Sequence, residues 1–215
     1  MLTRIILAFL SAAFALSVHA QGRPLPGKDY VELPTPQATE TGAKIEVVEF
    51  FWYRCPHCHA LEPLLTPWVK KLPADAQFRL VPAIFNDEWA LDARIFYTLE
   101  ATGYLERLHH PLLDAIHKEG GANLKGQAYL KWVSNWLAKH GVDISKYDAA
   151  FRSFTVESKV KRAFQTAQAY RLEGVPALAV QGKYVISGDG RTMLGVADYL
   201  IGETRRAGTK KPPAK

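Results

Sequence analysis

Residues 45–51, Ile-Glu-Val-Val-Glu-Phe-Phe, are dominated by β-branched and aromatic side chains. Such a run predicts a strand buried on both faces, as the strands of parallel sheets are. A helix is predicted directly after it, because Pro56 suits a first helical turn and apolar residues then recur at helical spacing up to residue 69. Residues 78–82 predict a second strand, which completes a strand–helix–strand unit.

The pattern becomes helical after residue 86. Apolar positions recur with a helical period over residues 87–102, 104–118, 127–140 and 144–154. Glycines close the first three of these segments, and Pro111 is expected to break the second. The remaining pattern predicts a helix over residues 156–170, strands at 177–180 and 183–186 joined by Gln181-Gly182, and a helix over 192–207.

These elements predict an α/β fold that is interrupted by helices. Residues 21–85 and 155–205 are expected to form the α/β domain, and residues 86–154 an all-helical insertion. The order of elements therefore places the first strand–helix unit and the last two strands in one domain.

The two ends of the chain carry different signals. Arg4, an apolar run to residue 18 and the sequence Val18-His19-Ala20 predict a signal peptide, residues 1–20, cleaved near Ala20. Export would place the mature protein in a compartment where disulfides persist. Residues 206–215 are expected to be a disordered basic tail.

Composition and charge narrow the function. With 48% hydrophobic and 22% charged residues, the chain is not a disordered, collagenous or polytopic membrane protein. Its formal net charge is +6, but Arg4 and five basic residues after position 204 account for all of it. The part between them has no net charge, so a nucleic-acid partner is not expected.

The two cysteines of the chain lie in Cys55-Pro56-His57-Cys58. A disulfide across so short a ring adds little stability, which indicates a reactive pair. Cys55 falls at the start of the predicted helix, where free backbone N–H groups and the macrodipole favour a thiolate. Cys58 would be the more buried, resolving cysteine, and His57 would stabilise the Cys55 thiolate further. A stabilised thiolate favours the reduced form, so the disulfide should be donated to other proteins.

Three further positions are candidates for roles at this pair. Glu49 shares a strand face with Val47 and Phe51, so burial should raise its pKa, and it could exchange a proton with Cys58. A cis Val175-Pro176 bond facing Cys55 would leave a backbone edge free to bind a substrate peptide by strand addition. Trp52 is expected to border the site and contact apolar segments of substrates, with packing in the core as the alternative.

Residues 49–58, Glu-Phe-Phe-Trp-Tyr-Arg-Cys-Pro-His-Cys, resemble the active-site segment of the DsbA family of periplasmic thiol-disulfide oxidases. Gly174-Val175-Pro176-Ala177 resembles the cis-proline loop of that family. The resemblance covers nearly all of the mature chain and implies a thioredoxin-like fold with an inserted helical domain. It also implies that Cys55 forms mixed disulfides with newly exported proteins and that Glu49 is the buried acid of the family.

The same resemblance implies a partner, and the sequence departs from the family pattern at one place. Reoxidation would come from a membrane quinone-linked reductase, DsbB or a DsbB-like protein. Some family members carry a lysine on the second strand near the buried acid, whereas residues 80–83 here read Leu-Val-Pro-Ala. The arm before residue 45 is too short for a dimerisation region, so we expect a monomer, without a cofactor or a metal.

Other functions remain open at this stage. A reductase or isomerase could use the same fold, and a peptide-binding chaperone could use the same groove. The C-x-x-C-H pattern of c-type haem attachment also fits Cys55, Cys58 and His59, with Met193 as a second axial ligand. The same three residues could instead form part of a zinc site. Four polar residues within residues 104–118 share a helical spacing that would suit a metal-binding face: Glu106, His110, Asp114 and His117. Because Pro111 should interrupt that helix, we expect them to form a solvated polar face instead.

Overall fold

The computed structural model describes residues 23–209. The predicted signal peptide, residues 1–20, and residues 210–215 of the predicted tail lie outside the described residues. Among the residues that are described, no helix is both long and apolar enough to cross a membrane.

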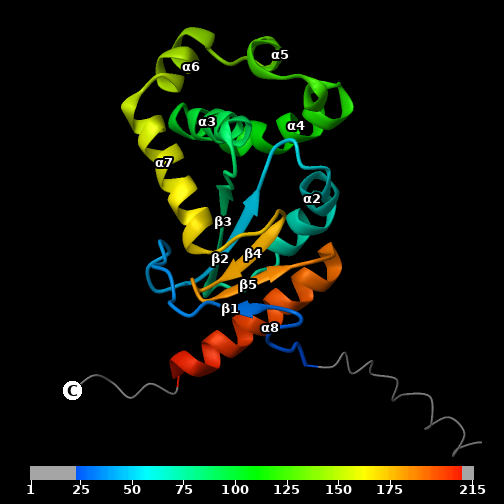
Figure 1. Cartoon of the computed structure of the whole chain (residues 1–215), viewed down its shortest axis with the longest axis vertical. Helices are drawn as coiled ribbons and strands as arrows, with labels where there is room; N and C mark the ends of the chain where they lie inside the picture. Colours follow the sequence, from blue (N-terminus) through cyan, green and yellow to red (C-terminus); the bar gives the residue numbers. More distant parts are fainter. Residues whose placement is uncertain (1–22, 210–215) are drawn as a thin grey trace, which may run out of the picture.

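A mixed sheet forms the centre of the molecule (Figure 1). Its strands in chain order are β1 (Val31–Glu32), β2 (Ile45–Phe51), β3 (Ala76–Pro82), β4 (Ala177–Val180) and β5 (Tyr184–Ser187). The spatial order is β1-β5-β4-β2-β3, in which only the β2–β3 pair is parallel. Every residue of β2 is buried, as its sequence predicts. The β4–β5 hairpin is confirmed, although three residues rather than two separate its strands.

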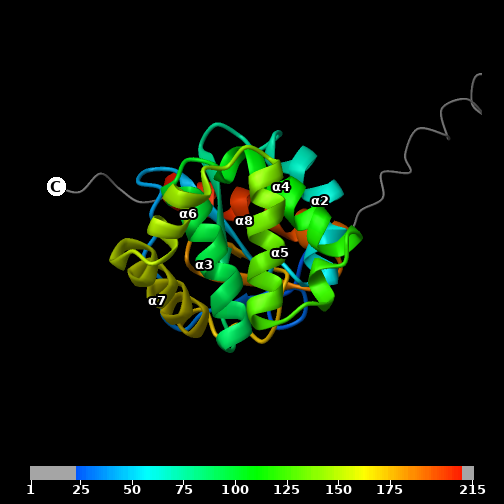
Figure 2. The ribbon, with the colours of Figure 1, turned by 90° about the horizontal axis from the view of Figure 1, so that it is seen from above.

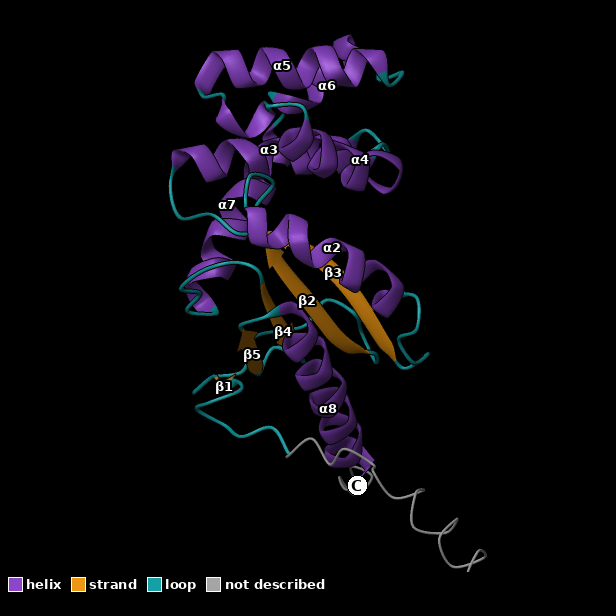
Figure 3. Cartoon of the chain, turned by 90° about the vertical axis from the view of Figure 1, so that its right-hand side faces the viewer, coloured by secondary structure: helices purple, strands orange, loops and turns teal. Residues whose placement is uncertain are grey.

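Helices surround this sheet and extend above it. They are α2 (Pro56–Val69), α3 (Asp87–Ala101), α4 (Leu105–Lys118), α5 (Gly126–Lys139), α6 (Ile144–Phe151), α7 (Phe154–Ala169) and α8 (Gly190–Thr209), with a 3-10 turn at Gly121–Asn123. Figure 3 shows α5 and α6 as the outermost layer, α3 and α4 beneath them, and the sheet below. Viewed from above, α3, α5 and α4 lie across the top of the molecule (Figure 2).

Side chains of β2 alternate between two cores. Val48 and Phe50 pack with Val160 of α7 on one face of the sheet. Val47 packs with Leu61 of α2 and with residues of α8 on the other face. A third core joins the end of β2 to the helical layer, and it contains both cysteines. The cysteine pair therefore lies where the sheet, α2 and the helical layer meet.

The predicted α/β fold with helices between β3 and α7 is confirmed, and the exact domain limits remain a prediction. Two details are corrected. Pro111 does not break α4, which runs without interruption because its apolar side, including Leu108, Leu112 and Ile116, is fully buried. The tail was expected to be disordered from residue 206, but α8 continues to Thr209, with Leu200 and Ile201 packed into the core.

Candidate active site

Cys55 lies at the point where the chain leaves β2 and enters α2. It is the N-cap residue of α2, and its Sγ accepts a hydrogen bond from the backbone N–H of Cys58 at 3.4 Å. Pro56 occupies the first helical position, where its missing N–H removes no helical hydrogen bond. Pro56 and His57 are exposed, whereas Cys58 is only 2% exposed. Cys55 is also buried, at 6% exposed, so Cys58 is the more buried of the two, as the sequence predicts.

The two thiols have opposite electrostatic environments. Hydrogen bonds from the Cys58 thiol and from the backbone N–H groups of Cys58 and His57, with a smaller contribution from the His57 charge, lower the pKa of Cys55 to about 6 against the effect of burial. Burial raises the pKa of Cys58, and so do the bond to Cys55 and the charge of Glu49. At neutral pH, Cys55 is therefore the thiolate and Cys58 the thiol.

Glu49 lies buried at the centre of β2, with 2% of its surface exposed. In the sheet it is paired with Leu80 of β3 and Leu178 of β4, so both strand neighbours are apolar. Among the described residues, no basic side chain forms an ion pair with it. Burial raises the pKa of Glu49 well above 4.5, and the charges of Glu62 and Cys55 add to the effect. These observations match the predicted location of Glu49 and the absence of a lysine beside it.

The loop before β4 brings backbone groups to Cys55. The Val175-Pro176 peptide bond is cis, and Cys55 Sγ lies 3.5 Å from the Val175 carbonyl oxygen, to which it can donate only when it is protonated. A cavity of about 660 Å³ opens beside this contact. Its lining includes His57 and Leu64 of the α2 segment, Val175, Pro176 and Gly188. An extended peptide placed here would lie within reach of the Cys55 sulfur.

Trp52 belongs to an aromatic cluster next to the cysteines. Its ring stacks on Trp89 of α3, with centroids 4.3 Å apart, and Phe85 packs against the other ring at 4.7 Å. Phe85 is 41% exposed. An apolar surface therefore borders the cysteine pair, in the place predicted for contacts with substrates.

A buried ion pair between Arg54 and Asp92 holds this cluster, and no local sequence pattern predicts it. Arg54 Nε donates to Asp92 of α3 at 2.8 Å, and both side chains are almost fully buried. Asp92 also accepts from Trp52 Nε1 and from the Tyr129 hydroxyl, both at 2.6 Å. Since the partners lie 37 to 40 positions apart, no short-range pattern connects them. The one signal in the sequence is the position of Asp92 among the apolar residues of α3, which could have suggested that this acid is buried.

The polar stripe on α4 does not simply face solvent, so that prediction is wrong. His110 pairs with Glu62 of α2 at 3.0 Å, and Asp114 pairs with His59 at 2.9 Å. His117 Nε2 lies 2.9 Å from the backbone oxygen of Tyr53. The stripe instead joins α4 to α2, because the unbroken helix presents these side chains to it.

The geometry does not assemble the alternative haem or zinc ligands. Met193 is buried between α8, α2 and the sheet, in the core that contains Leu61. His59 instead pairs with Asp114 and stacks on His117, with ring centroids 4.6 Å apart. Within residues 23–209, the one group of potential metal ligands does not contain either cysteine.

Comparisons with known proteins agree with this site. The model of the DSBA-like thioredoxin domain matches residues 77–195. Thiol:disulfide interchange protein DsbA of Azotobacter vinelandii is 43% identical over 185 residues, which cover 84% of this chain and 85% of that protein. The protein of the same name from Pseudomonas aeruginosa is 40% identical over 212 residues, 96% of this chain and 98% of that protein.

Solved structures show the same architecture. The crystal structure of Pseudomonas aeruginosa DsbA has a TM-score of 0.79 at 40% identity and covers 87% of this chain and 97% of that one. The oxidoreductase DsbA from Xylella fastidiosa has a TM-score of 0.79 at 33% identity and covers 86% of this chain and all of that one. With these relatives and its own buried Cys-x-x-Cys pair, the chain belongs to the DsbA-like thioredoxin family and is a thiol-disulfide oxidoreductase.

Proposed function

We propose that the oxidised protein donates its Cys55–Cys58 disulfide to dithiols of newly exported proteins, with Cys55 as the sulfur that is attacked. The observation that carries this proposal is the position of Cys55 at the N-cap of α2, where its sulfur accepts a backbone N–H. Such a site stabilises the thiolate and therefore the reduced protein. Stabilising the reduced form makes the disulfide more oxidising.

The exchange proceeds in two displacements. A substrate thiolate attacks Cys55 Sγ, the bond to Cys58 breaks, and the Cys58 sulfur leaves with the electron pair and takes up a proton. A second substrate thiolate then attacks the substrate sulfur of the mixed disulfide, and Cys55 leaves as a thiolate. The substrate gives up two electrons and gains a disulfide, while the protein becomes the dithiol.

Glu49 is the proposed source of the proton that Cys58 needs. Its raised pKa keeps the carboxyl protonated over a wider pH range than an exposed glutamate would be. A neutral acid near a buried leaving thiolate can act as a general acid and recover its proton when the protein is oxidised again. His57 is proposed to assist at the other sulfur, since both its N–H and its charge lower the pKa of Cys55.

Substrate binding is proposed to use two surfaces beside Cys55. The backbone of Val175 and Pro176 would pair with an extended segment around the substrate cysteine, as in strand addition. The cluster of Trp52, Trp89 and Phe85 would contact apolar residues that an unfolded protein exposes. Neither contact requires a particular substrate sequence, which suits an oxidase with many substrates.

The cellular setting is part of the proposal. The predicted signal peptide would deliver the protein to the periplasm, where it acts as a monomer and meets exported chains before they fold. A DsbB-like quinone-linked reductase in the membrane would accept two electrons from the dithiol and restore the disulfide. Residues 86–154 would form the helical insertion of the fold.

The direction of transfer is tested by mixing the oxidised protein with a reduced, unfolded protein and counting free thiols. We expect the substrate thiols to disappear as Cys55 and Cys58 become reduced, and an equilibrium with glutathione that favours the reduced protein. Cys55→Ala should fold and show no transfer. A wild-type protein that remains oxidised in mild glutathione buffers would instead indicate a reductase.

A further inference from the structure

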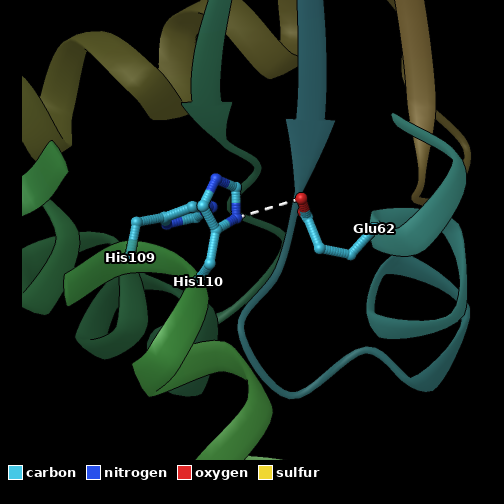
Figure 4. A group of neighbouring side chains, drawn as sticks. All are labelled: Glu62, His109 and His110. Atoms are coloured by element: carbon cyan, nitrogen blue, oxygen red, sulfur yellow. Dashed lines mark ion pairs between the residues drawn. The ribbon is translucent and has the colours of Figure 1, made fainter. Parts of the chain in front are cut away.

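We propose that Glu62, His109 and His110 form a binding site for a zinc ion at the junction of α2 and α4, separate from the cysteine pair. Figure 4 shows Glu62 reaching from α2 toward the two histidines, which come from consecutive positions of α4. This site is additional to the proposed redox function and does not depend on it.

The three side chains are already close enough to share one ion. One potential ligand atom from each lies within 4.8 Å of the other two, and Glu62 Oε1 is 3.0 Å from His110 Nδ1 (Figure 4). Around a tetrahedral zinc ion with bonds of about 2.1 Å, ligand atoms are about 3.4 Å apart. Bringing the three atoms to this spacing requires only small side-chain movements, and the His110 side chain, which is 51% exposed, has room to move.

His109 is held in the form that a metal ligand needs. Its ring is 3% exposed, and Nδ1 lies 3.1 Å from the hydroxyl of Tyr53. That bond fixes the ring orientation and leaves Nε2 as the nitrogen available to a metal, as outer hydrogen bonds do at known zinc sites.

Glu62 is oriented in a similar way. The hydroxyl of Thr66, one helical turn further along α2, donates to its carboxylate. The Glu62 side chain is 17% exposed, so it reaches the junction without being sealed from solvent. Two imidazoles and one carboxylate form an N₂O set, which matches catalytic-type zinc sites with three protein ligands. Zinc would displace the proton that His110 Nδ1 shares with Glu62.

A cavity supplies the space for a fourth ligand. About 360 Å³ of open volume lies against Glu62 and His110, bordered by Pro63, Pro67 and Leu113. A water molecule could complete the tetrahedron from this side, and the opening is also the path by which an ion enters.

The neighbouring pair of His59 and Asp114 is a poorer zinc site, which makes the assignment to Glu62, His109 and His110 specific. His59 and Asp114 line the same cavity and lie 2.9 Å apart. The ammonium group of Lys118, however, occupies Asp114 Oδ1 at 2.7 Å, and a second cation there would be repelled. Zinc is therefore expected at Glu62 and the two α4 histidines rather than at this pair.

The experiment uses the tag-free mature protein in its oxidised form, so that neither cysteine can bind the metal. Isothermal titration with zinc chloride should give one ion per chain, and cobalt(II) should show visible d–d bands typical of low coordination numbers. His110→Ala and Glu62→Gln should each weaken zinc binding by at least about tenfold. Tyr53→Phe, which keeps all three ligands, should weaken it by about tenfold through His109 alone.

The matched control is His59→Ala, which removes a histidine from the same cavity and should leave zinc affinity unchanged. Thermal unfolding of each variant in EDTA checks the fold, and the half-exposed His110 gives a variant that does not disturb the core. The proposal is overturned if the oxidised protein binds no zinc, or if binding persists in both His110→Ala and Glu62→Gln. It is also overturned if His59→Ala abolishes binding. Glutathione equilibria measured in EDTA test the redox function separately.

Discussion

At Cys55, burial and hydrogen bonding act on the thiol in opposite directions. Burial alone would raise its pKa, as it does at Cys58. The difference comes from the start of α2, where N–H groups have no helical acceptor and point to the Cys55 sulfur. Three positions along the helix, Cys58 has no such advantage, so the two sulfurs take different roles.

The contribution of His57 can be divided between its backbone and its side chain. His57→Pro removes both the N–H and the imidazole, whereas His57→Ala removes only the imidazole. We expect the pKa of Cys55 to rise by about one unit in His57→Pro, the size of one hydrogen bond to a charged group, and by less in His57→Ala. The protein should also become a stronger reductant, measured by its equilibrium with glutathione, and more so in His57→Pro than in His57→Ala. An unchanged equilibrium in His57→Pro would remove His57 from the mechanism.

The buried carboxyl of Glu49 should make stability depend on pH. Its native pKa is raised above 4.5, so between that pH and its native pKa the folded protein holds a proton that the unfolded chain has lost. Glu49 therefore does not reduce the free energy of unfolding below about pH 4.5. Above that pH it lowers this free energy by up to about 1.4 kcal/mol per pH unit.

Urea unfolding of the oxidised protein in EDTA, at several values between pH 4 and 8, measures this slope. Glu49→Gln cannot ionise, so its free energy of unfolding should rise relative to wild type as pH increases. Parallel curves for the two proteins would mean that Glu49 is ionised in the folded state, and the proton transfer to Cys58 would lose its basis.

At the scale of elements, the loop between β2 and α2 is fixed to the helical layer by one buried acid. Asp92 of α3 accepts from Trp52, Arg54 and Tyr129. Breaking a buried pair by removing one partner leaves the other charge uncompensated, which costs about 3–5 kcal/mol. Asp92→Ala should therefore lower the free energy of unfolding by this amount and loosen Trp52.

Glu88→Gln is the control for this prediction. Glu88 also faces Arg54, at 3.9 Å, but its side chain is 45% exposed. Exposed ion pairs contribute about 0–1 kcal/mol, so this variant should be close to wild type in denaturant unfolding. Equal losses in the two variants would show that the burial of Asp92 has no special effect.

Prediction from sequence succeeded for elements whose signal is local. The buried strand β2, the α2 start at Pro56 and the β4–β5 hairpin each follow from residues within one segment. It failed at Pro111, where tertiary packing of the apolar side of α4 outweighs a missing backbone donor. It also failed for the polar stripe of α4, because the partners Glu62 and His59 lie on α2, about 50 positions earlier.

At the scale of the whole molecule, the site lies in the core that joins the end of β2 to the helical layer, next to the two cores on the faces of the sheet. The order of predicted elements was enough for the α/β class, and the resemblance of residues 49–58 was enough for the family. The Arg54–Asp92 pair could not be predicted, since it depends on how distant elements are placed. The approach of Val175 to Cys55 was expected only as a cis-proline hypothesis, and its distance came from the structure.

The Cys55 thiolate should also be visible in the stability of the reduced protein. Its native pKa of about 6 lies below the ordinary cysteine value of about 8.5, so its contribution is complete above that pH and is lost as pH falls through 6. Relative to reduced Cys55→Ala, wild type should gain about 1.4 kcal/mol between pH 5 and pH 7. Urea unfolding of both proteins with a reductant measures the difference. A difference that does not change with pH would contradict a stabilised thiolate.

Titration of the reduced protein by thiolate absorbance at 240 nm tests the central claim most directly. A single step near pH 6, absent in Cys55→Ser, is the expected result, with no second thiolate appearing at neutral pH because the pKa of Cys58 is raised. A step near the ordinary cysteine value of about 8.5 would contradict the account, since the disulfide would then have no reason to be donated.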